Sequence, residues 1–201
     1  DRVGALTVPT TRDEDWRFTD ISPLTKLSFQ PAQDLPEIAP ATLEQWAIPE
    51  AAARLVFIDG IYAPQHSFNH AGLTVDTIAL GANRHQAAVQ AHLGRHAGFE
   101  HSAFTALNTA FLHDGALIVA PPGMASAAPV HLLFVARGKY AASYPRCLVI
   151  AEHHAALTLV EDFVSLQNEA YFTNAVTEVV LAGDAQVHHV RVQRESAAAF
   201  H

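Results

Sequence analysis

The chain has 201 residues and a mass of 21.7 kDa; half of its residues are hydrophobic and 16% are charged. This length fits one or two domains, and the apolar content is enough to build a core, so the chain cannot be disordered throughout. The 12 basic and 20 acidic residues give a formal charge of −8. An acidic chain argues against a general nucleic-acid binder, which needs a basic surface to displace counterions from phosphate.

The longest uncharged apolar runs are too short to span a membrane. Runs 115–122 and 129–136 each have about eight residues, whereas a membrane helix needs about 20. The single cysteine, Cys147, excludes an internal disulfide and a four-cysteine zinc site, and it suits a reducing, cytoplasmic compartment. Because the sequence opens without methionine and ends with an apolar residue next to last and no polar tail, we expect an N-terminal fragment of a longer protein.

The first half of the chain predicts helices mixed with short strands. Four prolines within 1–36 prevent a long helix there. Leu43, Trp46 and Ala47 share one helical face, and Thr42 is the expected cap of that helix. The predicted elements are a helix over 40–53, a strand over 54–60 ending in an Asp-Gly turn, a return strand at 61–62, a strand over 73–80, and helices near 87–93 and 104–111.

The second half predicts strands alone. Apolar runs recur with Gly, Pro, Asp and Asn between them, at 116–120, 130–136, 147–151, 157–163, 175–182 and 187–193. Pairs of gaps between the runs sum to about 30 residues, and no long helix fits between them, which disfavours a doubly wound α/β fold. A sandwich or barrel of hairpins and a solenoid of parallel strands both remain open. The apolar triplets 148–150 and 179–181 favour strands buried on both faces.

Histidine is abundant, with 13 residues. His66/His70 and His92/His96 have the i, i+4 spacing that places two imidazoles on one helical face, as in some metal sites. No glutamate follows the first histidine of either pair, as a zinc-peptidase motif requires, and 66–70 has the composition of a loop. A structural role is therefore the favoured interpretation of both pairs.

Three residues of the predicted strands are candidate metal ligands: His188, His189 and Cys147. Alternation along a strand sends the rings of His188 and His189 to opposite faces, although neutral imidazole is a good iron ligand. Arg146 faces away from Cys147 for the same reason, so it does not activate the thiol, and an inert structural cysteine is expected. We assign no catalytic and no cofactor-binding residue.

Acidic residues in or beside the strands are the only other candidates for chemistry: Glu161, Asp162, Glu178 and Glu195. A carbohydrate-active β-helix enzyme would use paired carboxylates such as Glu161 or Glu178. Adjacent Glu161 and Asp162 diverge, however, and the sequence contains no GxSxG, P-loop or GxGxxG motif. Two alternatives to a non-enzymatic domain stay open: this stand-alone enzyme, and a cupin-like module that binds metal through histidines.

Several strings together resemble the SufB/SufD family of iron–sulfur cluster assembly proteins. The first is Glu14-Asp15-Trp16-Arg17-Phe18-Thr19-Asp20, and further strings lie at 107–115, 118–123, 129–134, 145–152, 157–163, 173–178 and 190–195. Each is weak alone, but their order and spacing cover nearly the whole chain. The absence of a cysteine-rich N-terminal region favours the SufD side of the family.

The resemblance implies a mainly β protein: a partly helical α+β region over 1–113, then the first coils of a right-handed parallel β-helix over 114–201. It implies a non-catalytic scaffold that works with a SufB-like subunit and a SufC-like ATPase. The iron–sulfur cluster would be handled by the full complex, and no cofactor would be bound by this fragment. We also expect self-association through an exposed β-helix edge, and no nucleic-acid or membrane partner.

Overall fold

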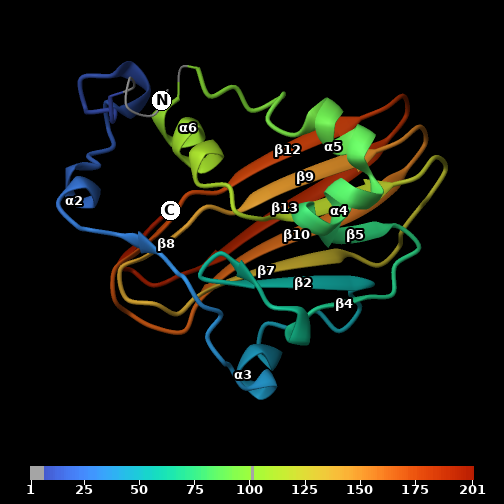
Figure 1. Cartoon of the computed structure of the whole chain (residues 1–201), viewed down its shortest axis with the longest axis horizontal. Coiled ribbons are helices and arrows are strands. Elements are labelled where there is room, and N and C mark those ends of the chain that lie inside the picture. Colours follow the sequence, from blue (N-terminus) through green and yellow to red (C-terminus); the bar gives the residue numbers. More distant parts are fainter. Residues whose placement is uncertain (1–6, 101) are drawn as a thin grey trace.

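The computed structural model describes residues 7–100 and 102–201, and strands dominate it (Figure 1). The N-terminal part contains η1 (Glu14–Trp16), α2 (Ser22–Thr25), β1 (Gln30–Pro31), α3 (Pro40–Glu44), β2 (Ala53–Ile58), β3 (Ile61–Tyr62), η2 (Pro64–His66), β4 (Phe68–Asn69), β5 (Thr74–Thr77), α4 (Ile78–Arg84), α5 (Gln86–His92) and α6 (Ala103–Ala110). Strands follow without further helices: β6 (Ala116–Ala120), β7 (Val130–Ala136), β8 (Ala141–Ser143), β9 (Arg146–Ala151), β10 (Ala156–Ser165), β11 (Tyr171–Thr173), β12 (Val176–Leu181), β13 (Gln186–Arg194) and β14 (Ala199–Phe200).

The strands form three sheets. Sheet A has the order β1-β8-β11-β14, sheet B the order β13-β10-β7-β2-β3 with β4 also on β2, and sheet C the order β12-β9-β6-β5. From β7 onward the chain visits sheets B, A and C in turn, first through β7, β8 and β9 and then through β10, β11 and β12. Neighbouring circuits pair in parallel, with Arg146 opposite Val176 and Ala156 opposite Gln186, so partners are 30 residues apart.

Sheets B and C face each other across the main core. Inward residues of both sheets, among them Leu132, Val149 and Leu159, are fully buried in one apolar cluster. The register stacks equivalent aromatic rings: Phe134 lies 5.4 Å from Phe57 and 4.7 Å from Phe163 between ring centroids. Such in-register pairs stabilise neighbouring strands and fix the register of the circuits.

Helices cover the outer faces of the two sheets (Figure 1). Leu43 of α3 packs against the outer face of sheet B, whereas Ile78 of α4 and Val89 of α5 pack against the outer face of sheet C. Strands β7 and β9 are therefore buried on both sides along their whole length, which explains the continuous apolar runs of the sequence. Within the described residues, no helix is long and apolar enough to cross a membrane.

The six predicted strands after residue 114 are confirmed, and so are the helices near 87–93 and 104–111. The hairpin sandwich or barrel is wrong as an alternative, because strands β7 to β14 pair only in parallel within the described residues. Burial of 179–181 on both faces was also a wrong expectation. Val179 and Leu181 are 37% and 53% exposed, because β12 is the edge strand of sheet C.

Two predicted elements of the first half are shorter than expected. The strand over 73–80 ends at Thr77, whose side chain accepts a hydrogen bond from Leu80 N and caps α4 instead. The helix over 40–53 stops at Glu44, and Pro49 prevents its continuation toward 53 because proline lacks the backbone N–H of a helix interior. Thr42 does not cap that helix, which begins at Pro40 after Ala39 without a side-chain cap.

Candidate functional site

A polar cluster lies inside the stack at the circuit that ends the described chain. Glu161 points inward from β10 and is 1% exposed, in register between Leu132 of β7 and Arg191 of β13. Its carboxylate accepts hydrogen bonds from Thr177 Oγ1 at 2.5 Å and from Arg191 Nε and Nη2 at 3.1 and 2.9 Å, and it lies 3.2 Å from His189 Nε2. The core thus changes from apolar at β7 to polar at β13.

The cluster holds its acid ionised and its thiol protonated. Burial opposes ionisation of Glu161, but hydrogen bonds from His189 and Thr177 and the charge of Arg191 outweigh it and lower its pKa to about 2. Burial, and next the nearby Glu161 carboxylate, raise the pKa of the Cys147 thiol well above its ordinary value. A protonated, buried thiol is a poor nucleophile and a poor metal ligand.

The three candidate metal ligands have different surroundings. Cys147 is 2% exposed in the core beside Glu161, and His189 contacts the same carboxylate with a side chain that is 30% exposed. His188 is exposed to solvent on β13. Because it is adjacent to His189 in the strand, its side chain points to the opposite face. No group of three or more His, Cys, Asp or Glu that could hold a metal occurs in residues 7–100 and 102–201. Their metal role stays a prediction.

Arg191 lies between the buried carboxylate of Glu161 and the surface. Its side chain is 36% exposed, and it lines a cavity of about 450 Å³ beside sheet A. Four aromatic side chains contribute to its lining, Trp16, Phe104, Phe172 and Phe200, and the Phe104 ring lies 5.4 Å from Trp16 and 6.3 Å from Phe172 between centroids. The cavity therefore adjoins the polar cluster through Arg191, which lines the cavity and donates to Glu161. The sequence did not indicate this cavity.

The outer face of sheet B holds a second ionic group. Asp162 is 1% exposed; it pairs with Arg194 and lies 3.5 Å from His131 Nε2. Burial opposes ionisation, but His131 and Arg194 lower the pKa of Asp162. Glu161 and Asp162 therefore point to opposite faces, as their adjacency on a strand requires, and do not form a working pair of carboxylates.

A buried clasp joins the helical segment to the outer face of sheet C. Arg146 Nη2 lies 2.6 Å from Glu178 Oε2, and both side chains are at most 1% exposed. Glu178 also accepts hydrogen bonds from the backbone N–H groups of Gly94, His96 and Ala97. Burial opposes ionisation, yet these four partners together lower the pKa of Glu178. The sequence singled out Glu178 as a catalytic alternative, whereas its carboxylate is fully occupied by structural donors.

The two histidine pairs have different geometries. His66 is buried in η2, and His70 stacks on Phe68, so these two rings have separate neighbours. The rings of His92 and His96 are in contact, with Nδ1 of the first 3.1 Å from Nε2 of the second. Only the second pair has the geometry that the i, i+4 spacing suggests.

The chain is thus a protein of stacked parallel strands arranged in repeated circuits, with charged side chains in part of its interior. Two family models cover the chain: the SufBD protein N-terminal region at residues 2–132, and the SufBD core domain of SUF system FeS cluster assembly at residues 134–201. The chain belongs to the SufB/SufD family.

Individual relatives agree with this assignment. An iron–sulfur cluster assembly SufBD family protein of Synechocystis is 33% identical over 215 residues, covering 100% of this chain and 47% of the relative. The iron–sulfur cluster assembly protein SufD of Escherichia coli is 26% identical, covering 96% and 44%. SufD of Bacillus subtilis is 23% identical, covering 92% and 44%. The chain thus spans about half the length of the curated relatives it matches.

Proposed function

We propose that the protein containing this chain is a non-catalytic scaffold subunit of the SUF iron–sulfur cluster assembly system, located in the cytoplasm. Its partners would be a second family member resembling SufB and an ATPase resembling SufC. Family membership supports the system, and the names of the two SufD relatives support the kind of subunit. The iron–sulfur cluster would be handled by the complete complex.

We propose further that the B–A–C circuits are the first coils of a right-handed parallel β-helix over 114–201, behind an α+β region over 1–113. The 30-residue register and the parallel pairing support the helix. Parallel crossover connections are right-handed in about 98% of cases, which supports its hand. The two regions share sheet B, because β2 pairs with β7 in parallel.

The observation that carries the scaffold role is the match of two SufBD family models, to residues 2–132 and 134–201. β13 has nine residues and pairs only with β10, and β12 pairs only with β9, within the described chain. Unpaired backbone groups along such an edge pair with a further strand, which can come from a later coil of the same protein or from another chain. The enzyme alternative has weaker support, since both Glu161 and Glu178 are already saturated by donors.

Co-purification tests this role. The complete protein, tagged and expressed with its neighbouring genes, should retain an ATPase and a second SufB/SufD-type subunit in fixed stoichiometry. It should show no hydrolytic turnover of acidic polysaccharides. Isolation of the complete protein alone under these conditions, or such turnover, would exclude the proposed role.

The isolated 201-residue chain should self-associate through the edge of β13. Gln186 N donates to Ala155 O of the neighbouring circuit, so the alternate N–H groups, including that of Gln193, face the free edge. Gln193→Pro removes one of these donors without breaking the ladder, whereas Gln193→Ala keeps it. Light scattering should give oligomers for the parent chain and for Gln193→Ala, and a smaller species for Gln193→Pro. A parent chain that is strictly monomeric contradicts edge pairing.

A further inference from the structure

Two imidazole rings meet at the surface where α5 ends. His92 is the last residue of α5, and His96 follows four residues later. Nδ1 of His92 lies 3.1 Å from Nε2 of His96, and the ring planes are inclined by 25° with centroids 5.4 Å apart. His92 is half-buried and His96 is exposed, so solvent reaches the space beside the two facing nitrogens.

The backbone between the two histidines is fixed to sheet C. Gly94 turns the chain with a φ of +71°, a conformation that favours glycine. The N–H groups of Gly94 and His96 donate to the buried carboxylate of Glu178 at 2.8 and 2.9 Å, and Arg146 holds that carboxylate in place. The backbone that carries His96 is therefore held beside the end of α5, which limits the ordering needed for both rings to act together.

The separation of the two nitrogens matches chelation of one metal ion. Imidazole–metal bonds are about 2.0–2.1 Å long, so two nitrogens in adjacent coordination positions lie roughly 2.9–3.4 Å apart in square-planar to tetrahedral geometry. The observed 3.1 Å falls within this range. Without metal, one ring donates a hydrogen bond to the other; with metal, His92 Nδ1 and His96 Nε2 both present lone pairs and their other ring nitrogens carry the protons.

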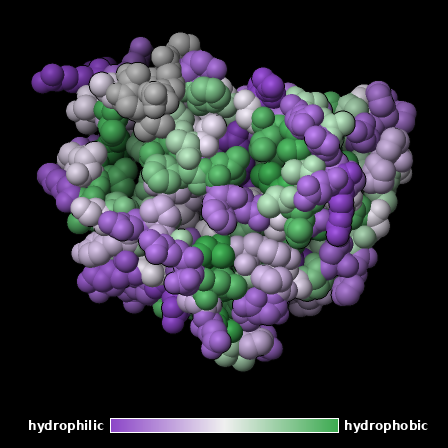
Figure 2. All heavy atoms as spheres, viewed as in Figure 1, coloured by the Kyte–Doolittle hydropathy of each residue, from purple (hydrophilic) through white to green (hydrophobic). Residues whose placement is uncertain are grey.

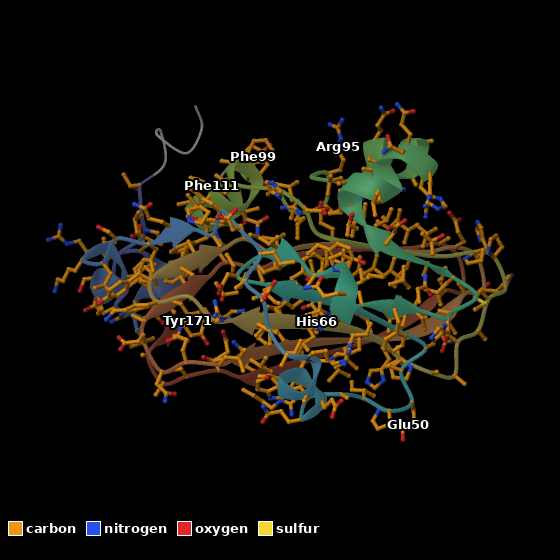
Figure 3. The ribbon with its side chains drawn as sticks, turned by 60° about the horizontal axis from the view of Figure 1, so that its bottom comes forward. Glu50, His66, Arg95, Phe99, Phe111 and Tyr171 are labelled. Atoms are coloured by element: carbon orange, nitrogen blue, oxygen red, sulfur yellow. The ribbon has the colours of Figure 1, made fainter. Side chains whose placement is uncertain are left out.

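We propose that His92 and His96 form a two-imidazole site for a first-row divalent transition-metal ion such as Ni²⁺, Cu²⁺ or Zn²⁺, with water in the remaining positions. Imidazole suits these ions, and two adjacent ligands from one rigid segment bind more tightly than either alone. Arg95 does not crowd the ion, because its side chain projects outward from the surface beside α5 (Figure 3).

Another histidine pair of the same chain provides a matched control. His153 and His154 are adjacent in sequence, their ring centroids are 6.5 Å apart, and His154 lies 3.6 Å from Asp184. Both residues are exposed, and no contact joins a nitrogen of one ring to a nitrogen of the other, in contrast to His92 and His96. General affinity of surface histidines for metal would therefore involve both pairs equally.

Calorimetric titration of the complete protein with Ni²⁺ tests the site. The parent and the double variant His153→Ala/His154→Ala should share one binding event that is at least tenfold weaker in His92→Ala and in His96→Ala. In NMR spectra of the parent, paramagnetic Ni²⁺ should broaden the ring signals of His92 and His96 first. This measurement uses the parent protein alone, so it does not depend on whether the variants fold. Equal affinity in all four proteins, or broadening that begins at other histidines, would overturn the proposal.

Discussion

Glu178→Ala should lower the free energy of unfolding by about 3–5 kcal/mol, the range for removing one partner of a buried ion pair. The substitution leaves the guanidinium of Arg146, which is 1% exposed, without its carboxylate. It also removes the acceptor of three backbone N–H groups, those of Gly94, His96 and Ala97. Urea unfolding followed by circular dichroism measures the loss.

A double variant separates the ion pair from the packing around it. Arg146→Met combined with Glu178→Leu removes both charges and fills the space with apolar atoms. It should recover part of the stability lost in Glu178→Ala, because an apolar replacement of a buried pair is often close to neutral. Recovery should be incomplete, because three backbone N–H groups still lack their acceptor and Asn108 Oδ1 loses its donor Arg146 Nη1, 3.0 Å away. A double variant less stable than both single variants would show that the clasp is not the stabilising unit.

Long strands were predictable from the sequence, whereas short strands and the start of one helix were not. Apolar runs predicted β7 and β9 closely, because burial on both faces leaves a continuous signal in the chain. The short strands β8, β11 and β14 escaped prediction, since two or three residues show no periodicity. The alternation over 73–80 extends the predicted strand beyond β5 into the first three residues of α4, where the cap made by Thr77 begins a helix instead.

The site depends on partners about 30 residues apart, and this explains which parts of it were predictable. Alternation alone placed Glu161 and Asp162 on opposite faces and separated Arg146 from Cys147. It did not reveal that Arg191 stands opposite Glu161, because that contact needs the length of one circuit. Two successive gaps between apolar runs sum to about 30 residues, which is the length of one circuit. Pairing charged residues at this separation identifies Glu161 and Arg191. The loop that supplies Gly94, His96 and Ala97 to Glu178 left no such periodic signal.

The face in Figure 2 carries apolar side chains in separate patches divided by hydrophilic ones. Scattered patches of this kind are normal for a folded surface. The less usual feature is internal: a carboxylate within a core where the previous circuit places Leu132. Burial of Glu161 is tolerated because both carboxylate oxygens have partners, Thr177 at Oε1 and Arg191 and His189 at Oε2, so stability in this circuit depends on the charge of one residue.

The stability of the chain should therefore fall in acid, and Glu161 should contribute to the fall together with Asp162 and Glu178, whose pKa values are also lowered. A carboxyl whose pKa drops from 4.5 unfolded to about 2 folded stabilises the fold at neutral pH by about 3 kcal/mol, at about 1.4 kcal/mol per pKa unit. Because the folded pKa is the lower one, this contribution is complete above pH 4.5 and disappears as the pH falls toward 2. Unfolding in urea at pH 7, 4 and 3 measures the decline.

Glu161→Gln should be less stable than the parent at pH 7, and the difference should shrink steadily between pH 4.5 and pH 2, because the amide does not titrate. Glu169→Gln is the matched control: this carboxylate lies 3.1 Å from Lys139, but both side chains are more than half exposed, so its loss should change stability by less than about 1 kcal/mol at any pH. A stability difference between Glu161→Gln and the parent that stays constant from pH 7 to pH 3 would contradict this prediction. It would mean that the amide destabilises the fold through its hydrogen-bonding geometry, and that the charge of Glu161 does not stabilise this circuit.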